Sequence, residues 1–312
     1  MNWLQITFLV LVAIALGLLL YSRVIAATYA RVTTLIVVGT IMLMPFAWLI
    51  CSAFKDKEVL QKYTFLPPPG LLTQKTSTGT MPINLDNFRT LFADKQTVQG
   101  PVSFWRYVGN SLFLASAGTF ISLVFSSMGG YALAKYRFKA RPAIVTFMLA
   151  SVTIPGAALL SPNFEVIWRL GWMNTYLALI VPGCVSVFGI FLFRQAMVGV
   201  PDDLIEAGRI DGCGEFRIYL TLIMPLVRPM VGAFCLISFL GAWNSFITPN
   251  IYLQSQAKLT LPVVLNQYIG EYAQQYGVFL AGTLLAIIPP AVLFFSLQRE
   301  FISGLTSGAV KQ

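Results

Sequence analysis

The chain has 312 residues, of which 57% are hydrophobic and only 11% are charged, and its formal net charge is +9. Soluble cores interrupt their apolar runs every few residues with a polar face, whereas this chain carries uncharged stretches longer than the roughly 20 residues that a membrane-spanning helix needs. The composition therefore excludes a soluble protein and predicts an integral membrane protein surrounded by lipid.

The positive net charge does not indicate nucleic-acid binding, because the basic residues lie between and beside the uncharged stretches, as the positive-inside rule expects. Each span must satisfy its backbone polar groups internally, which favours helices, whereas a transmembrane barrel would show weaker alternating segments of about ten residues. The predicted fold class is all-α, a polytopic transmembrane helical bundle. Seven stretches are candidate spans, at residues 1–22, 32–54, 107–134, 142–164, 170–193, 229–257 and 272–298.

Residues 1–31 are predicted to form a transmembrane helix and a short cytoplasmic link. A cleavable signal sequence also has a short apolar core, but it normally begins with positive charge, and the initial stretch MNWLQITF has none. The first stretch is therefore interpreted as an uncleaved helix whose N-terminus lies outside.

A long polar segment at residues 55–106 follows the second span. It contains LPPPG and TSTGTMP, which are typical of turns and loops, and then the mildly amphipathic LDNFRTLFAD, which predicts a short helix at the outer surface. Farther along the chain, four prolines lie inside predicted spans, where each removes a backbone donor and favours a bend. These prolines are Pro155, Pro182, Pro289 and Pro290.

The orientation of the chain follows from its basic residues. Four bases occur within seven residues after the third span, namely Lys135, Arg137, Lys139 and Arg141. The positive-inside rule places this loop in the cytoplasm. The same orientation puts residues 194–228 and the C-terminus in the cytoplasm, and residues 55–106 outside.

Catalytic chemistry is not indicated. The sequence contains no histidine and no Gly-Lys dipeptide, so H-E-x-x-H, Ser-His-Asp and P-loop arrangements are excluded. The cysteines, Cys51, Cys184, Cys213 and Cys235, are scattered singly and indicate neither disulfides nor a metal site. No span carries an acid or a base near its centre, where ion-coupled carriers usually keep one. The chain is therefore predicted to hold no cofactor, and the energy for any transport is expected to come from elsewhere.

One polar stretch, EAGRIDGCGEF at residues 206–216, lies in the cytoplasmic loop at residues 194–228. A helix is predicted to begin just before it. Pro201 suits the first turn of a helix, and the negative charges of Asp202 and Asp203 favour the positive end of the helix dipole.

The rest of the stretch predicts a helical hairpin. Leu204, Ala207 and Gly208 share one face of the first helix, where two small residues allow a partner surface to approach the backbone. Gly212 and Gly214 break this helix, and a second helix is expected through EFRIYLTLIM until the following proline stops it. The alternative is an ordinary connection between two spans.

The spacing favours a docking role over a connector. From Glu206 the pattern reads E-A-G, three residues, Gly212, and then Pro225 nineteen positions after the glutamate. It resembles the cytoplasmic EAA loop of ABC importer permeases, which forms the coupling helix that docks into the ATPase subunit. Mild departures from the family pattern occur at Gly208, Leu222 and Met224. The resemblance implies these coupling residues: Glu206, Ala207, Gly208, Asp211, Gly212 and Pro225.

Further motifs extend the resemblance over residues 32–312, and together they are similar to the carbohydrate-importer branch, specifically its maltose-type second permease subunit. Most members of that family have six spans, so residues 1–31 are interpreted as an additional helix. The motifs are NSLFLASAGTFISLVFSSMGGYALAKYRF, LGWMNTYLALIVP, FLGAWNSF, TLPVVL and QREFISGLTSGAVK.

The resemblance implies an assembly in the inner membrane of a prokaryote. Its other members are a second, different permease, two copies of an ATPase subunit that bind ATP and Mg, and an extracytoplasmic solute-binding protein. Closure of the ATPases is expected to pull the coupling helices together and turn the cavity outward. A sugar or sugar derivative is the expected substrate, and the sequence does not specify which one.

A substrate path is expected where polar groups and an aromatic face occur inside a span. Trp243 and Asn244 fit this description, with Asn110 as a third candidate. The alternatives are that Trp243 belongs to an interfacial aromatic belt, that Asn244 bonds a neighbouring helix, and that Asn110 caps a helix or joins two helices.

Three other functions stay open. One is an ABC permease for a non-sugar solute. Another is an ion-coupled secondary transporter, against which the lack of charge at mid-membrane argues. The third is a purely structural membrane subunit, which would bind partners yet tolerate changes in the loop, for example at Gly212.

Overall fold

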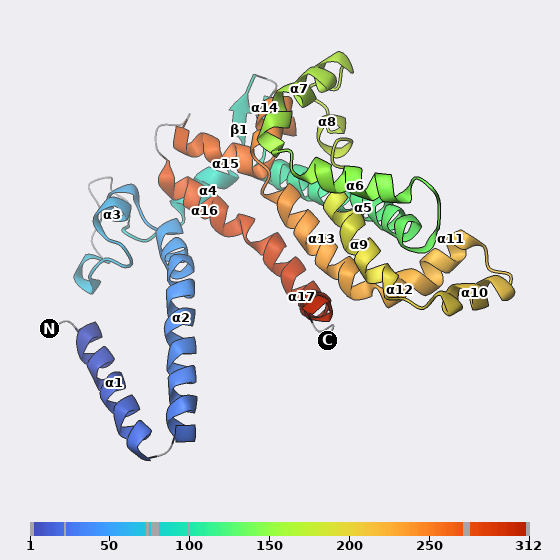
Figure 1. The fold of residues 1–312 in the computed structure, drawn as a ribbon. Coiled ribbons are helices and arrows are strands. Elements are labelled where there is room, and N and C mark those ends of the chain that lie inside the picture. Colours follow the sequence, from blue (N-terminus) through green and yellow to red (C-terminus); the bar gives the residue numbers. More distant parts are fainter. Residues whose placement is uncertain are drawn as a thin grey trace. The chain divides into compact units, whose positions relative to one another are not determined.

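The computed structural model describes residues 3–21, 23–72, 75, 81–98, 100–270 and 275–309. Its regular structure is mostly helical, in agreement with the predicted class, and the sheet found among these residues is a two-stranded hairpin. The chain divides into two compact units, Met1–Asn87 and Phe88–Gln312, and each is described by itself (Figure 1).

The first unit contains two long helices followed by a short folded segment. Helix α1 (Trp3–Tyr21) carries no charged residue, and α2 (Arg23–Ala53), which contacts it, continues through Pro45. The segment after α2 contains the short helix α3 (Lys57–Lys62) and a 3-10 turn, η1 (Pro69–Leu71).

Lys55 holds the segment after α2 together. Its side chain is fully buried, and its Nζ donates to the backbone oxygens of Tyr63 at 2.9 Å and Thr64 at 2.8 Å. Asn87 Nδ2 donates in turn to the backbone oxygens of Ala53 at 2.9 Å and Lys55 at 2.8 Å. Buried polar groups need such partners, so these contacts make the segment a folded one rather than a free loop.

The second unit begins within α4 (Asp86–Phe92), the short helix that LDNFRTLFAD predicts. A small antiparallel hairpin follows, formed by β1 (Lys95–Thr97) and β2 (Gly100–Val102), with Lys95 opposite Val102. The sequence of this region predicts only turns and a helix, so the hairpin is an addition to the predicted all-α class.

Four helices form the packed centre of the second unit: α5 (Phe104–Lys135), α9 (Val187–Val198), α13 (Arg228–Trp243) and α17 (Ile288–Ala309). Helix α5 packs on α9 and α13, and α13 packs on α17 (Figure 1). A Cβ on Gly130 would lie 2.6 Å from Phe193 Cβ, and one on Gly189 would lie 2.5 Å from the Phe234 ring. Helices inside a membrane associate closely through such small residues.

Shorter helices complete the second unit around this centre. They are α6 (Arg141–Val152), α7 (Leu160–Arg169), α8 (Leu177–Ile180), α14 (Ile247–Tyr252), α15 (Leu261–Gly270) and α16 (Tyr276–Ala286), with 3-10 turns η2 (Gly156–Leu159) and η4 (Gln256–Lys258).

The predicted count of seven spans is not confirmed. Within the described ranges, three helices are long and apolar enough to cross a membrane, namely Ala27–Ala53, Phe104–Lys135 and Tyr276–Glu300. Two bent helix pairs raise the number to five if each pair is one span. The chain is thus mostly helical, with three to five candidate spans.

Two predicted spans are broken rather than continuous. At residues 142–164, Arg141–Val152 and Gly156–Arg169 meet at an angle of 95°, with Pro155 at the break. At residues 170–193, the segment between α8 and α9 is not helical and contains Pro182. The expectation of bends at these prolines is confirmed, because each lacks the donor that a continuous helix requires.

The predicted span at residues 229–257 also ends early. Helix α13 stops at Trp243, Asn244 is its C-cap, and a new helix starts at Ile247. The residues at this break are uncharged, so hydropathy alone did not reveal it. Pro289 and Pro290 lie in the first turn of α17, directly after the joint with α16, where a missing backbone donor is tolerated.

Candidate functional site

The polar stretch of the sequence forms a compact hairpin at one end of the packed centre of the second unit (Figure 1). This polar hairpin, residues 201–227, consists of α10 (Asp202–Ile210), α11 (Glu215–Ile218), a π-helical turn η3 (Tyr219–Ile223) and α12 (Met224–Leu226). Its two arms are the two helices that the sequence predicts.

Helix α10 begins directly after Pro201, as predicted. Asp202 and Asp203 lie in its first turn and Arg209 lies in its last turn, so that each charge is near the end of the helix dipole that it stabilises. Local charge and the preceding proline therefore account for a short helix at this position.

Gly212 ends α10 in a left-handed conformation, with a φ of +77°. The Cys213 N–H donates to the Gly208 oxygen at 2.9 Å, and the Gly212 N–H donates to the Arg209 oxygen at 3.0 Å. This pair of bonds is the Schellman motif, which satisfies the last carbonyls of a helix and favours glycine at the left-handed position. The glycine break predicted from the sequence is confirmed here.

The outer face of α10 and α11 is apolar as well as charged. Ile210 is 86% exposed, Phe216 is 62% exposed and Leu204 is 44% exposed. Large exposed apolar side chains on a polar loop are typical of a surface that another protein covers. The predicted coupling residues on the exposed surface are Glu206, Ala207, Asp211, Gly212 and Pro225.

Gly208 does not lie on this outer face, which corrects the prediction that it shares an exposed face with Leu204 and Ala207. It is buried against the second arm of the hairpin, where a Cβ would lie 3.0 Å from Leu222 Cδ1 and 3.3 Å from Ile218 Cγ1. The small residue at this position therefore serves the close approach of the two arms.

Pro225 does not stop the second helix, and the prediction that it does is wrong. The chain passes through the π turn at residues 219–223, the Met224 N–H donates to the Tyr219 oxygen, and the helix continues to Leu226. A proline ring clashes with the carbonyl four residues earlier, and the wider π turn relieves that clash. The sharp change of direction, 83°, occurs at Val227 before α13.

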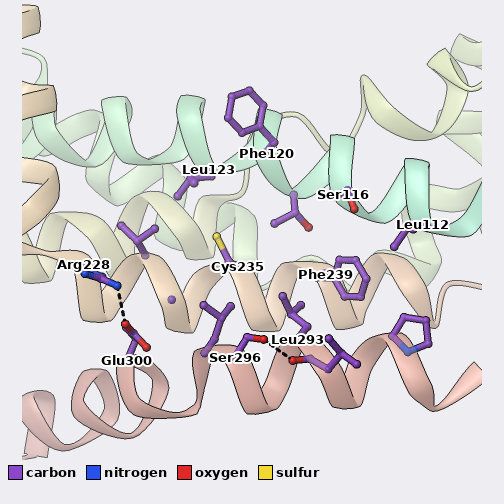
Figure 2. A pocket seen from close by; sticks show the side chains of 16 residues that line it. Leu112, Ser116, Phe120, Leu123, Arg228, Cys235, Phe239, Leu293, Ser296 and Glu300 are labelled. Carbon is purple, nitrogen blue, oxygen red and sulfur yellow. Dashed lines mark hydrogen bonds and ion pairs between the residues drawn. The ribbon is translucent and has the colours of Figure 1, made fainter.

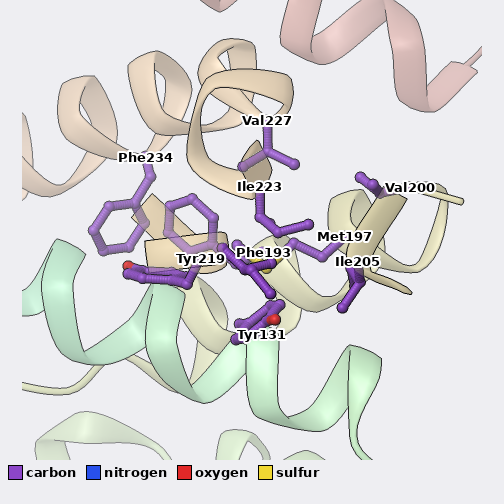
Figure 3. Packing of buried hydrophobic residues seen from close by; sticks show 10 residues of the cluster. Tyr131, Phe193, Met197, Val200, Ile205, Tyr219, Ile223, Val227 and Phe234 are labelled. Carbon is purple, nitrogen blue, oxygen red and sulfur yellow. The ribbon is translucent and has the colours of Figure 1, made fainter. Parts of the chain in front are cut away.

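A buried apolar cluster lies beneath the hairpin (Figure 3). It joins side chains of α5, α9, both hairpin arms and α13. The Tyr219 hydroxyl lies 2.6 Å from Ser127 Oγ of α5 within this cluster. The members are Tyr131, Phe193, Met197, Val200, Ile205, Ile218, Tyr219, Ile223, Val227 and Phe234.

Polar contacts also join the hairpin to the end of α5. Lys135, whose side chain is only 6% exposed, donates to the Val200 oxygen and to Asp202 Oδ1, which lies 2.6 Å away. This hydrogen bond and the lysine charge lower the pKa of Asp202. The Tyr136 hydroxyl donates to Glu215 Oε2 at 2.6 Å. Neither contact is predictable from the sequence alone, because the partners lie 67 and 79 residues apart.

The residues predicted to line a substrate path have other partners. Trp243 is only 3% exposed, stacks on Phe239, and donates its Nε1–H to the Ala286 oxygen at 3.2 Å. It therefore packs α13 against α16 and does not form part of an aromatic belt. Asn244 is the exposed C-cap of α13.

Asn110 joins two parts of the fold, which is one of the roles considered for it. Its Nδ2 donates to the backbone oxygens of Ala257 at 3.0 Å and Leu259 at 2.9 Å. The neighbouring Ser111 Oγ accepts from the Leu261 N–H at 2.8 Å, at the start of α15. These two residues bind α5 to the segment at residues 257–261.

A cavity of about 220 Å³ lies beside the predicted path residues. Five residues with hydroxyl side chains are among those that line it, namely Ser111, Ser238, Ser245, Thr248 and Thr260. Thr260 Oγ1 is buried and has no hydrogen-bond partner in the described part of the chain. A buried hydroxyl without a partner is costly, so the cavity suits a ligand or water that hydrogen-bonds there.

A second, larger hollow of about 650 Å³ lies between α5, α13 and α17 (Figure 2). Leucine, phenylalanine and valine supply half of the residues that line it. At one end Arg228 Nη2 pairs with Glu300 Oε1 at 3.1 Å, as the dashed line in Figure 2 shows. Its apolar lining suits hydrocarbon rather than a polyhydroxylated solute.

Comparison with known families gives one match that spans most of the chain. Residues 110–304 match the family described as binding-protein-dependent transport system inner membrane component. The arabinooligosaccharides transport system permease protein AraQ of Halalkalibacterium halodurans is 35% identical over 276 residues, which cover 88% of this chain and 93% of AraQ. The lactose transport system permease protein LacG of Rhizobium radiobacter is 32% identical over 269 residues, covering 86% and 91%.

A solved structure has a similar fold. It is a bacterial ABC transporter involved in the import of the acidic polysaccharide alginate, and one of its chains aligns with a TM-score of 0.75 at 20% identity. The alignment covers 90% of this chain and 99% of the other. At this identity the likeness concerns the fold alone.

Proposed function

Because the chain belongs to the family of binding-protein-dependent transport system inner membrane components, we propose that it forms half of the translocation path of an ATP-driven sugar importer. It is a permease subunit of the carbohydrate-importer branch, of the second-permease type, and a multi-pass protein of the inner membrane. It is a transport component without an ATPase domain, and in such systems a partner ATPase binds ATP. The family predicted from the sequence is confirmed.

The observation that carries the proposal for coupling is the exposed face of the polar hairpin. Ile210, Phe216 and Leu204 stand out from a loop that also has the E-A-G, Gly212 and Pro225 spacing. Burial of these side chains against an ATPase subunit would be favourable by about 25 cal/mol for each Å² removed from water. We assign Glu206, Ala207 and Asp211 to the docking surface, Gly212 to the bend behind it, and Gly208 to its inner packing.

The topology that accompanies this function places the polar hairpin and the C-terminus in the cytoplasm and residues 55–106 outside. Residues 32–312 form the importer domain, with six spans that include the bent helices, and residues 1–31 add a seventh. The cluster of basic residues after α5 supports this orientation, since Lys135 at the end of α5 contacts the hairpin directly.

The partners follow from the same family. ABC transporters of this kind contain ATPases and a periplasmic binding protein. For this chain we assign a second, different permease, two copies of one ATPase subunit and one extracytoplasmic solute-binding protein. An ATP-driven mechanism agrees with the absence of any acidic or basic residue near the middle of a predicted span, where ion-coupled carriers usually keep one.

For the sugar path, the hydroxyl-lined cavity is a better candidate than Trp243, Asn244 and Asn110. Trp243 and Asn110 are engaged in contacts between helices, whereas Ser238, Ser245 and Thr260 are among the residues that line the cavity. A volume of about 220 Å³ is sufficient for one sugar ring. The relatives AraQ and LacG, permease proteins of an arabinooligosaccharides and a lactose transport system, support a sugar as the substrate.

The test is uptake by liposomes that contain the purified complex of this chain with its partner permease and ATPases, with the binding protein outside. Radiolabelled arabinotriose and lactose are the probes. We expect ATP-dependent uptake of at least one probe, loss of uptake without the binding protein, and no effect of an ionophore. Uptake by this chain alone that an ionophore abolishes would contradict the proposal in favour of an ion-coupled carrier. ATP-driven uptake of amino acids but of neither sugar would contradict the sugar assignment.

A further inference from the structure

Two neighbouring residues at the end of α5, Lys135 and Tyr136, reach both ends of α10. Lys135 Nζ donates to the Val200 oxygen and to Asp202 Oδ1, at the start of α10. The Tyr136 hydroxyl donates to Glu215 Oε2, which lies just beyond the end of α10. The end of α5 therefore contacts both the start of α10 and Glu215, just beyond the end of α10.

Glu215 extends this contact to α10 itself. Its Oε1 accepts a hydrogen bond from Arg209 Nε at 2.7 Å, and Arg209 lies in the last turn of α10. The Tyr131 hydroxyl, one turn earlier on α5, lies 3.5 Å from the same carboxylate. Hydrogen bonds to a charged group are short, strong and directional, so the carboxylate fixes the angle of α10 as well as its distance.

The covalent connections of α10 do not fix its orientation. Residues 199–201, which join it to α9, are not helical. The connection to α13 runs through a π turn and an 83° bend at Val227. The apolar cluster beneath the hairpin attracts without a preferred direction. A directional contact with a long span is therefore needed if α10 is to transmit a rotation.

We propose that Lys135, Tyr136 and Glu215, here named the α5 clamp, are positioning residues that make α10 and α5 move as one body. This inference rests on the proposed docking of an ATPase subunit on the polar hairpin. In this arrangement a displacement of α10 by the ATPase is passed to α5 at the clamp, before it reaches the bend at Val227.

Helix α5 carries that displacement to the other end of the second unit. It has 32 residues, which corresponds to about 48 Å at 1.5 Å per residue. Near its first turn Asn110 and Ser111 bind the segment at residues 257–261, which includes Thr260 of the hydroxyl-lined cavity. The clamp and these two residues thus connect the docking hairpin to that cavity through one continuous helix.

The experiment compares Tyr136→Phe, Glu215→Ala and the double variant in the complete complex in liposomes. Tyr136→Phe keeps the ring that packs edge to face on Tyr131 and removes the hydroxyl that bonds Glu215. The measured quantity is sugar uptake per ATP hydrolysed, with arabinotriose and lactose as probes. The matched controls are Tyr276→Phe, at the exposed start of α16, and Glu165→Ala, which breaks the exposed pair with Arg169.

We expect each single variant to lower the uptake per ATP by on the order of fivefold, with ATP hydrolysis retained, and the controls to leave it unchanged. The double variant should resemble Glu215→Ala alone, because both changes remove the same contact. Effects that simply multiply, or an unchanged ratio in both single variants, would overturn the clamp. If the wild-type complex imports neither probe, the proposed function fails instead, and the second measurement still tests the clamp.

That second measurement needs no transport. In a variant with Cys51, Cys184 and Cys235 replaced by serine, the half-buried Cys213 reports on the seating of the hairpin. We expect a maleimide to label Cys213 several times faster in the Glu215→Ala and Tyr136→Phe variants than in the Glu165→Ala control. Equal labelling rates in all of them would contradict a clamp that holds α10 in place.

Discussion

Gly212 and Gly214 lie two residues apart in the polar hairpin. Both positions have room for a side chain, but their backbone conformations differ. A Cβ added at either position meets no atom within 4 Å. Gly212 has a φ of +77°, whereas Gly214 has a φ of −70°. Only the first of these conformations excludes a β-branched side chain.

Replacement of Gly212 by valine should therefore strain the bend of the hairpin by about 1–2 kcal/mol, while Gly214→Val should cost little. Both variants should reach the membrane in normal amounts, because the hairpin lies between intact helices. We expect Gly212→Val to lose most of its substrate-stimulated ATP hydrolysis and uptake in the reconstituted complex. Near-normal transport by Gly212→Val, together with a similar result for Glu206→Ala, would return the loop to a plain connector.

Thr260 tests whether the hydroxyl-lined cavity holds sugar. Valine has nearly the same shape as threonine and lacks the hydroxyl, whose oxygen has no partner among the described residues. Thr260→Val should leave the melting temperature of the purified protein equal or slightly higher, because an unpaired buried hydroxyl is removed. If a sugar hydroxyl bonds Thr260 during transport, the KM for uptake should rise by roughly five- to tenfold.

The control for this experiment is Thr153→Val, at the break between α6 and η2, where the threonine bonds the Ala150 oxygen. It should leave the KM unchanged. An unchanged KM for Thr260→Val as well would mean that the cavity lies off the sugar path.

At the residue scale, the sequence predicted local backbone conformation better than it predicted the contacts of individual side chains. The break at Gly212 followed from two glycines and a spacing, and both are local properties. Trp243 was selected because it is aromatic and next to an asparagine, yet its indole bonds a carbonyl 43 residues away on α16. A single sequence contains no signal for such a pairing.

Gly130 and Gly208 both lie where two helical segments pack closely, but the atoms that an added Cβ would meet differ. A Cβ on Gly130 of α5 would lie 2.6 Å from Phe193 Cβ and 2.9 Å from the Arg194 nitrogen, and neither atom moves unless α9 moves. A Cβ on Gly208 of α10 would meet Leu222 Cδ1 at 3.0 Å, at the free end of a flexible side chain. The same substitution should therefore have different results.

Gly130→Ala should destabilise the protein by about 1–3 kcal/mol, because α5 and α9 must separate. Gly208→Ala should be close to neutral, since alanine gains roughly 1 kcal/mol of helix propensity and Leu222 can turn aside. Thermal unfolding of the purified variants in detergent measures both. An equal loss in the two variants would show that the interior of the hairpin is as rigid as the packing of α5 on α9.

At the scale of elements, apolar runs predicted where helices lie but not whether they are continuous. The long uncharged run at residues 229–257 contains the end of α13, a turn and the start of α14. Hydropathy averages over such breaks. At Pro225 the error is the opposite one, because a break was predicted where the helix continues. The preceding residues form a π turn that accommodates the proline ring.

For the whole molecule, the orientation in the membrane is a prediction that one cysteine tests. In a variant that retains Cys213 and lacks the other three cysteines, a membrane-impermeant thiol reagent should label inside-out vesicles and leave intact cells unlabelled. The prediction rests on the positive residues that follow α5 and on their contact with the hairpin. Labelling in intact cells would invert the proposed topology.

The general plan of the molecule was accessible from the sequence, because the motifs of its family are spread along most of the chain. The α5 clamp was not. Lys135 was interpreted only as one of four inner bases, and Glu215 only as part of a second helix. Their roles depend on α5 and the hairpin meeting in space, which is a property of the folded chain.

Exposed side chains on the hairpin also matter before the complex assembles. They belong to Ile210, Phe216 and Leu204. In the proposed complex an ATPase subunit covers these side chains, and before assembly they present an exposed apolar surface to the surrounding water. A permease subunit that has not assembled with an ATPase is thus prone to aggregation and to degradation by proteases that recognise exposed apolar groups. Coordinated synthesis of the permease and its ATPase would limit the amount of unassembled permease. Excess permease should have a short half-life.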